Sequence, residues 1–187
     1  MNKSSTIKKL CISALMIALA TVLSLIPLFK MPLGGTLTPL SMFPICIVGI
    51  KYGTKQGIFT AFAYSLIQII ISIGEIMSWG LSKEILIGSI FLDYIIAYTI
   101  LGLSAMFRKG GTKGICAGMA LAMFMRFFCH FLSGIIFFDT WCTEGWNLWV
   151  YSLCYNGAYI MPELILSVIL MALLLRNKQV KKLLTEE

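Results

Sequence analysis

Long apolar runs separated by short polar segments follow one another along the whole chain. They lack the one-sided stripe that a soluble amphipathic helix shows, and most are long enough to cross a bilayer as a helix. The pattern predicts an all-α integral membrane protein, a single membrane domain over residues 1–187. Six spans are predicted, roughly 10–26, 37–50, 57–73, 85–107, 114–138 and 148–175.

The composition supports a membrane protein, because 59% of the residues are hydrophobic and only 12% are charged. Soluble domains carry about twice that charged share. The first apolar run follows the basic stretch MNKSSTIKK, as in a signal peptide, but it is longer than a usual signal core and has no small-residue cleavage site. We therefore expect it to be retained as the first span.

The second run is short and contains Pro39 and Pro44, so a re-entrant segment is the alternative to a span. Charge decides between them. With six spans, the loops on one side hold only Lys30 and Lys83, and the opposite side holds twelve basic residues: Lys3, Lys8, Lys9, Lys51, Lys55, Arg108, Lys109, Lys113, Arg176, Lys178, Lys181 and Lys182. The positive-inside rule then predicts six spans with both termini in the cytoplasm.

Several classes of protein are disfavoured by what the sequence carries. The net charge of +7 comes from clusters between apolar runs, which is typical of topology-setting loops and not of a nucleic-acid surface. The six cysteines form no CxxC pair, so we expect neither a metal site nor a disulfide framework. Motifs for hydrolase nucleophiles, zinc proteases and ATP binding are missing from the sequence, so we expect no enzyme.

Ionisable residues inside membrane spans are rare and usually functional. Asp93 lies nine residues after Glu84, the only histidine, His130, lies nine before Asp139, and Asn156 lies nine after Asn147. At a helical rise of about 1.5 Å per residue, all three lie roughly 13 to 14 Å below the outer surface. An acid, an imidazole and an amide from three helices at one depth predict a polar pocket in the outer half.

The neighbours of these residues indicate what the pocket binds. Aromatic rings and one space-leaving glycine lie beside or above them, at Tyr94, Gly134, Phe138 and Tyr151. A carboxylate among aromatic rings suits a small, flat, cationic ligand. The alternative is that the polar groups only satisfy one another. The four tryptophans, of which Trp79 and Trp141 are candidates for the site, fit either an interfacial belt or a binding mouth.

Two further ionisable residues lie deeper, Arg126 and Glu163. A cation one turn below His130 would oppose a cationic ligand. We therefore expect Arg126 to join helices by pairing with a carboxylate, with Glu163 or Asp93 as its partner, and we assign Arg126 and Glu163 to a structural ion pair.

Five stretches in combination resemble a known family. They are LSLIP, MPLGGTLTPLSMFPI, LDYIIAY, RFFCHFLSGIIFF and YSLCYNGAYIMPE, and the resemblance covers essentially the whole chain. The chain resembles the thiamine-specific S component of energy-coupling factor (ECF) transporters. The resemblance implies a six-helix bundle in the bacterial cell membrane that binds thiamine from outside, without a cofactor. It implies docking on a transmembrane coupling protein and two ATPase subunits, among membrane lipid.

The resemblance also assigns roles to residues. Asp93 corresponds to the family's binding acid and His130 to its histidine, with Gly134, Tyr151 and Asn156 in the pocket and Phe138 stacking on the ligand. The outer loop FKMPLGG is expected to form a lid, and Trp79 to replace a family aromatic. An AxxxA pattern, here Ala14 and Ala18, contacts the coupling protein in the family, and small residues at this spacing allow close helix contact. An S component for another vitamin, such as riboflavin, or a structural membrane protein are the alternatives.

Overall fold

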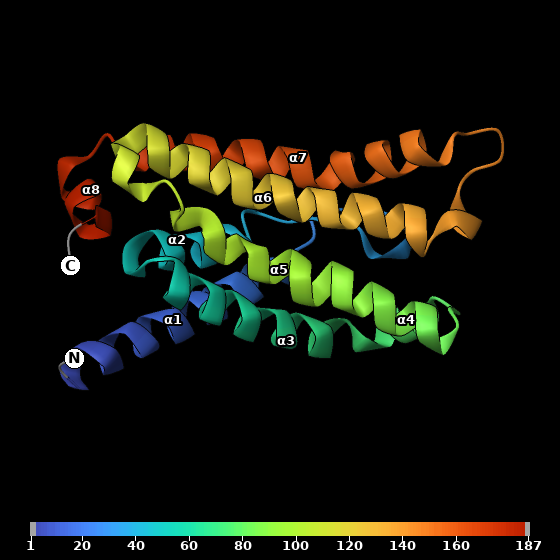
Figure 1. Ribbon diagram of the computed structural model, residues 1–187, viewed down its shortest axis with the longest axis horizontal. Helices are drawn as coiled ribbons and strands as arrows, with labels where there is room; N and C mark the ends of the chain where they lie inside the picture. The colour runs from blue at the N-terminus through green and yellow to red at the C-terminus, as the bar shows by residue number, and fades with distance from the viewer. Residues whose placement is uncertain (1–2, 186–187) are drawn as a thin grey trace.

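The computed structural model describes residues 3–185, which leaves the first two and last two residues of the chain outside the description. Long helices run side by side along the longest axis, and both ends of the chain lie at the same end of the bundle (Figure 1). The mostly helical architecture confirms the predicted fold class.

Within residues 3–185, five helical passages are long and apolar enough to cross a membrane, and each coincides with a predicted span. They are α1 (Lys3–Ser24), α3 (Thr54–Ser78), the passage Lys83–Ala105, α6 (Gly111–Ile136) and α7 (Leu148–Leu174). A helix of 22 to 27 residues is about 33 to 40 Å long, enough to cross the hydrocarbon core.

The second predicted span, residues 37–50, is wrong as a continuous helix. Strands β1 (Phe29–Lys30) and β2 (Thr36–Leu37) form a short antiparallel hairpin, and α2 covers only Phe43–Tyr52. Pro39 disfavours helix in the residue before it, and Pro44 is the second residue of α2, in the first turn, where proline is tolerated. The non-helical segment between β2 and α2 is largely buried in protein, which is where irregular backbone is tolerated at membrane depth.

The fourth passage changes its helical winding where it carries Asp93. It consists of α4 (Lys83–Ser89), a π-helical stretch Ile90–Ile96, the short α5 (Ala97–Thr99) and a 3-10 stretch Ile100–Ala105. π-Helical insertions are rare and frequently lie at functional sites. The apolar pattern gave no sign of this change, because it interrupts neither the length nor the hydrophobicity of the span.

A final helix, α8 (Lys178–Thr185), follows the last span and was not predicted. Asn177 caps it, with its Oδ1 accepting from the backbone N–H groups of Gln179 at 2.8 Å and Val180 at 3.3 Å. α8 lies at the end of the bundle that holds both termini and buries Leu184 against the core (Figure 1).

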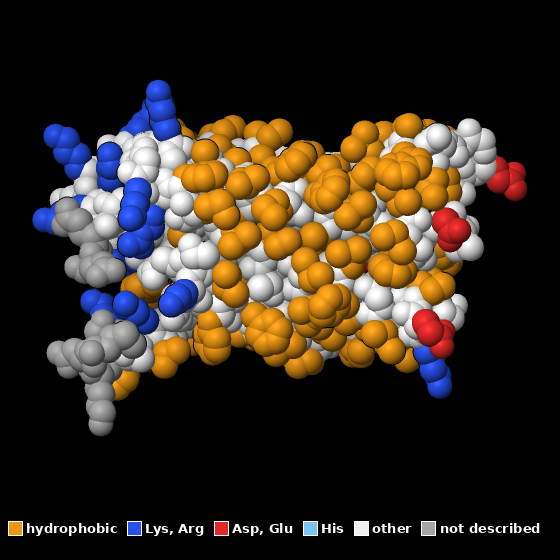
Figure 2. Space-filling model, viewed as in Figure 1, with side chains coloured by type: hydrophobic (Ala, Val, Ile, Leu, Met, Phe, Trp, Pro, Cys, Tyr) orange, Lys and Arg blue, Asp and Glu red, His pale blue; other side chains and the backbone are white. Residues whose placement is uncertain are grey.

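Charge is divided between the two ends of the molecule. In the face shown, lysine and arginine gather at the end with the termini, acids lie at the opposite end, and apolar side chains cover the surface between them (Figure 2). The structure thus places both termini and the basic residues at one end, as the predicted topology requires, and the cytoplasmic side of that end stays a prediction. The acidic end is called the outer end below.

Glycines let the helices of the inner half touch backbone to backbone. A Cβ atom on Gly102 would overlap the backbone of Gly57 and Ile58 in α3, and one on Gly118 would overlap the Ser104 carbonyl. Such close approach closes the inner half of the bundle. In the outer half the helices are separated by large aromatic and polar side chains, which surround a cavity.

Candidate functional site

A cavity of about 350 Å³ lies between the hairpin, α3, the π-helical stretch, α6 and α7. A volume of this size suits a small molecule. All nine residues that the sequence nominated for ligand binding line it: Trp79, Asp93, Tyr94, His130, Gly134, Phe138, Trp141, Tyr151 and Asn156. The structure thus brings them together, and their roles in ligand binding stay a prediction.

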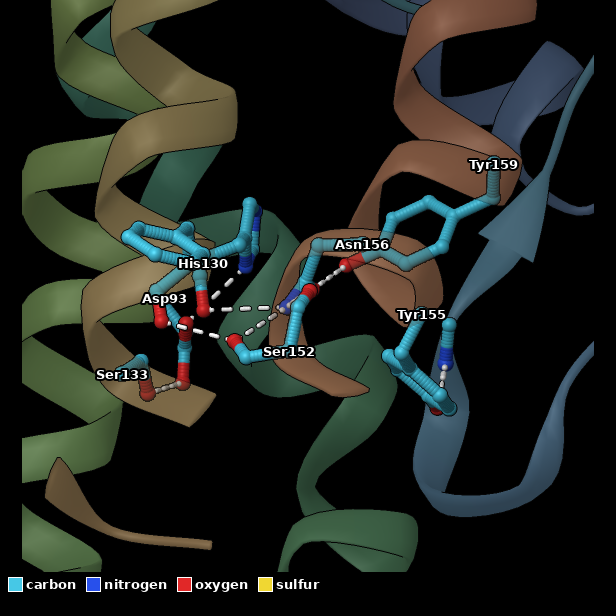
Figure 3. Close-up of polar contacts among 9 residues, drawn as sticks. Asp93, His130, Ser133, Ser152, Tyr155, Asn156 and Tyr159 are labelled. Carbon is cyan, nitrogen blue, oxygen red and sulfur yellow. Dashed lines mark hydrogen bonds and ion pairs between the residues drawn. The ribbon is translucent and has the colours of Figure 1, made fainter. Parts of the chain in front are cut away.

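Asp93 and His130 form the polar centre of the cavity (Figure 3). Oδ1 of Asp93 lies 2.9 Å from Nδ1 of His130, and Oδ2 accepts a hydrogen bond from the Ser133 hydroxyl. Both carboxylate oxygens are therefore held by α6. The other ring nitrogen of His130, Nε2, is buried and has no hydrogen-bond partner among the described residues. It is the ring atom left to meet a ligand.

Asn156 joins this centre to α7. Its amide nitrogen donates to the backbone carbonyl of His130 at 3.2 Å and to that of Ser152 at 3.0 Å, and its Oδ1 accepts from the Tyr159 hydroxyl at 2.8 Å (Figure 3). The predicted common depth of Asp93, His130 and Asn156 thus corresponds to a chain of direct contacts across three passages.

Gly134 makes this junction possible. A Cβ at Gly134 would overlap the Ser152 hydroxyl and would lie 3.4 Å from the amide nitrogen of Asn156. The Ser152 hydroxyl itself donates to the Phe131 carbonyl at 2.8 Å, which fixes α7 against α6. Gly134 therefore serves helix approach directly, and it shapes the cavity through the position of Asn156.

Aromatic rings form the cavity wall. Trp79 is only 7% exposed and meets Phe138 edge to face, with ring centroids 5.3 Å apart. Tyr94 stacks on Tyr98, and Tyr151 stacks on Tyr155, each at 6.0 Å. Trp141 is 45% exposed at the rim, and Trp146 and Trp149 are exposed outside the cavity. The tryptophans therefore divide, with Trp79 in the wall and the others at the outer surface.

The hairpin closes over the cavity and is attached to two helices. The Gly35 N–H donates to the Tyr155 hydroxyl of α7 at 3.2 Å, and that hydroxyl donates to the Pro32 carbonyl. On the other side, Nζ of Lys30 lies 3.1 Å from Oε1 of Glu75 in α3. Residues of the FKMPLGG stretch, namely Lys30, Gly34 and Gly35, line the cavity, as a lid would.

The cavity lining also includes residues that the sequence-based site did not name, among them Glu75, Ser133, Tyr155 and Tyr159. Ser133 and Tyr159 lie three residues after His130 and Asn156, so helical spacing could have found them. Glu75 lies beyond residue 73, where the third predicted span ends, whereas α3 continues to Ser78.

The predicted ion pair between Arg126 and Glu163 is wrong as a direct contact. Among the described residues, ion pairs within 4.0 Å are Lys30–Glu75 and Asp93–His130. The Arg126 guanidinium instead lies over the Tyr98 ring, 4.8 Å from its centroid. Arg126 also lines the cavity, although the sequence analysis assigned it to contacts between helices.

Ala14 and Ala18, the predicted docking residues, are exposed on α1. Most residues of α1 are exposed or half-buried, so most of this helix faces outward. The structure contains no partner chain, and docking through these two alanines stays a prediction.

Comparison with known proteins gives the family. Residues 10–183 match the family model described as thiamine transporter protein. The chain is 30% identical over 188 residues to the thiamine transporter ThiT of Bacillus subtilis (strain 168), covering 93% of each sequence. It is 25% identical over 148 residues to the thiamine transporter ThiT of Lacticaseibacillus paracasei, covering 72% of this chain and 70% of the relative.

The fold matches a solved structure as well. The ThiT structure from Listeria monocytogenes superimposes with a TM-score of 0.73 at 22% identity, covering 95% of this chain and 98% of the other. Because the family model extends over almost the whole chain, the chain belongs to the thiamine transporter protein family, which is a family of transporters and not of enzymes.

Proposed function

We propose that the chain is the high-affinity thiamine-binding subunit of an ATP-driven ECF vitamin transporter, which captures thiamine from outside. The observation that carries this proposal is the Asp93–His130–Asn156 contact chain inside an aromatic cavity of about 350 Å³ toward the outer end. Membership of the thiamine transporter family supports the choice of ligand.

The chemistry of the cavity suits thiamine, which joins a cationic thiazolium to an aminopyrimidine. The Asp93 carboxylate supplies negative charge, and the rings of Trp79, Phe138 and Tyr151 offer faces that attract a cation. The free Nε2 of His130 offers a hydrogen bond to the polar ring of the ligand. One carboxylate with several aromatic faces thus provides for both halves of the ligand.

The proposal assigns energy supply to other chains. The sequence has no ATP-binding motif, so transport is driven by two ATPase subunits through a transmembrane coupling protein. The exposed face of α1 that carries Ala14 and Ala18 is the proposed docking surface, in the bacterial cell membrane. Two small residues one helical turn apart allow a partner helix to approach closely.

A vitamin panel tests the ligand assignment. Purified protein is titrated with thiamine and with riboflavin, and intrinsic tryptophan fluorescence is followed, because Trp79 and Trp141 line the cavity. Quenching by thiamine alone supports the proposal. Quenching by riboflavin, or a yellow preparation, would identify an S component for another vitamin. No response to either would favour a structural membrane protein.

Reconstitution tests the coupling. Liposomes containing the chain alone should bind radiolabelled thiamine without accumulating it. Addition of an ECF coupling protein with its two ATPases should give ATP-dependent accumulation. Accumulation by the chain alone would contradict the assigned division of labour.

A further inference from the structure

The segment between β2 and α2 forms part of the cavity floor. Thr38, Ser41 and Met42 are buried and line the cavity, and they directly follow the hairpin that covers it. Any displacement of this segment would therefore alter the floor and the attachment of the hairpin at once.

Glu163 of α7 holds this segment from outside the cavity. Its Oε1 accepts from the Met42 N–H at 3.0 Å and from the Ser41 hydroxyl at 3.2 Å, and the Thr38 hydroxyl lies 3.4 Å from both carboxylate oxygens. Met42 precedes α2 and provides no side-chain cap of its own. The carboxylate thus serves as a cap for α2 supplied by another helix.

Leu40 lies within the segment that Glu163 holds, and its backbone is strained. Its φ is 64°, and it is the non-glycine residue with positive φ in the described part of the chain. In this conformation Cβ crowds the neighbouring carbonyl, which costs free energy for any residue with a side chain beyond glycine. Such strain persists only where the surroundings hold it, and it accumulates at sites that switch between conformations.

We propose that Glu163 is a positioning residue for ligand retention, which holds residues 38–42 in a strained conformation that keeps the hairpin lowered over the cavity. When the Glu163 contacts break, Leu40 relaxes and the hairpin lifts. Glu163 does not line the cavity, so its effect on a ligand passes through this segment. We call residues 38–42 the hinge. The identity of the ligand rests on the proposed function, whereas the contacts of Glu163 with the hinge are present without a ligand.

Hydrogen–deuterium exchange of the ligand-free protein tests the hinge directly. Glu163→Gln keeps the size of the side chain but loses its charge, so the amides of residues 41–43 should exchange about tenfold faster. Ser167→Ala is the matched control, because Ser167 is buried one turn further along the same helix face and its hydroxyl has no partner in the described part of the chain. Unchanged exchange in Glu163→Gln would overturn the proposal.

The rate of thiamine dissociation is a second test, in which the Glu163 and Leu40 variants should change the rate in opposite directions. Glu163→Gln should release bound thiamine about tenfold faster in a chase experiment. Leu40→Gly should release it about threefold more slowly than Leu40→Ala, because both lack the leucine side chain and only glycine accepts positive φ without strain. Lower melting temperatures with equal release rates in all variants would show a merely structural role.

The two measurements separate this inference from the assignment of the ligand. If the parent protein does not bind thiamine, the proposed function fails. In that case the role of the hinge can still be tested without a ligand. The test compares the rate of amide exchange at residues 41–43 between Leu40→Gly and Leu40→Ala. Slower exchange in the glycine variant supports it, and equal exchange overturns it.

Discussion

The carboxylate of Asp93 meets the imidazole of His130 across two helical passages, with Oδ1 and Nδ1 2.9 Å apart. The second carboxylate oxygen is held by Ser133, one turn further along α6. The acid is therefore fixed in place before any ligand arrives. A site ordered in advance loses less conformational entropy on binding, which favours high affinity.

Asp93→Asn should weaken thiamine binding by about 30-fold to 150-fold, since hydrogen bonds to charged groups contribute about 2 to 3 kcal/mol. Asparagine still reaches Ser133 and His130, so the melting temperature should change little. Calorimetric titration and a thermal melt measure the two effects. Glu144→Gln, an exposed acid outside the cavity, is the control. A lower melting temperature with unchanged affinity would show that Asp93 only supports the fold.

Gly134→Ala should destabilise the protein by about 1 to 3 kcal/mol, because the added methyl group overlaps the Ser152 hydroxyl. Binding should weaken too, since Asn156 moves with this part of α7. Combining it with Ser152→Gly should restore part of the stability. Gly157→Ala is the control, because the nearest atom to its Cβ would lie 4.0 Å away. Similar melting temperatures for Gly134→Ala and Gly157→Ala would contradict the helix contact.

Tyr155→Phe should speed thiamine release more than Glu75→Gln does. The Tyr155 hydroxyl binds two backbone groups of the hairpin, Gly35 and Pro32. The Lys30–Glu75 pair has side chains 58% and 34% exposed, and such pairs contribute about 0 to 1 kcal/mol. Thiamine release rates of both variants are measured at low and high salt. Salt should weaken only the Lys30–Glu75 ion pair and not the hydrogen bonds of Tyr155. A larger effect at Glu75 would reverse this ranking.

Replacing both Ala14 and Ala18 by leucine should weaken assembly with the coupling protein and leave thiamine affinity unchanged. Both alanines are exposed and lie on α1, outside the cavity. Leucine would prevent close helix contact there. Co-purification with the ECF module measures assembly, with Ala158→Leu on the exposed face of α7 as the control. Equal loss of assembly in both variants would argue against a specific surface.

Much of the fold was predictable, because membrane spans are defined by length and hydropathy, and orientation by charge. The second span was not, since burial in protein lets residues 38–42 form bends and turns where lipid exposure would require a helix. α8 was not either, because it is an amphipathic helix of eight residues, too short and too polar to be found as a membrane span.

The site was predictable to the extent that depth could be counted along a helix. Counting nine residues from each outer end predicted one level for Asp93, His130 and Asn156, and in the structure the three residues contact one another. Counting gives the depth of a residue but not the direction in which its side chain points around the helix. It therefore could not show that Arg126 lies over the Tyr98 ring or that Glu163 accepts a hydrogen bond from Met42. It also could not place Glu75, whose position depends on where α3 ends.

Isothermal titration calorimetry of the purified chain with thiamine tests the central claim most directly. The account predicts one thiamine bound per chain with a dissociation constant below about 1 µM, equivalent to more than about 8 kcal/mol. No heat of binding at micromolar thiamine, with a cooperative melt showing that the protein is folded, would contradict it.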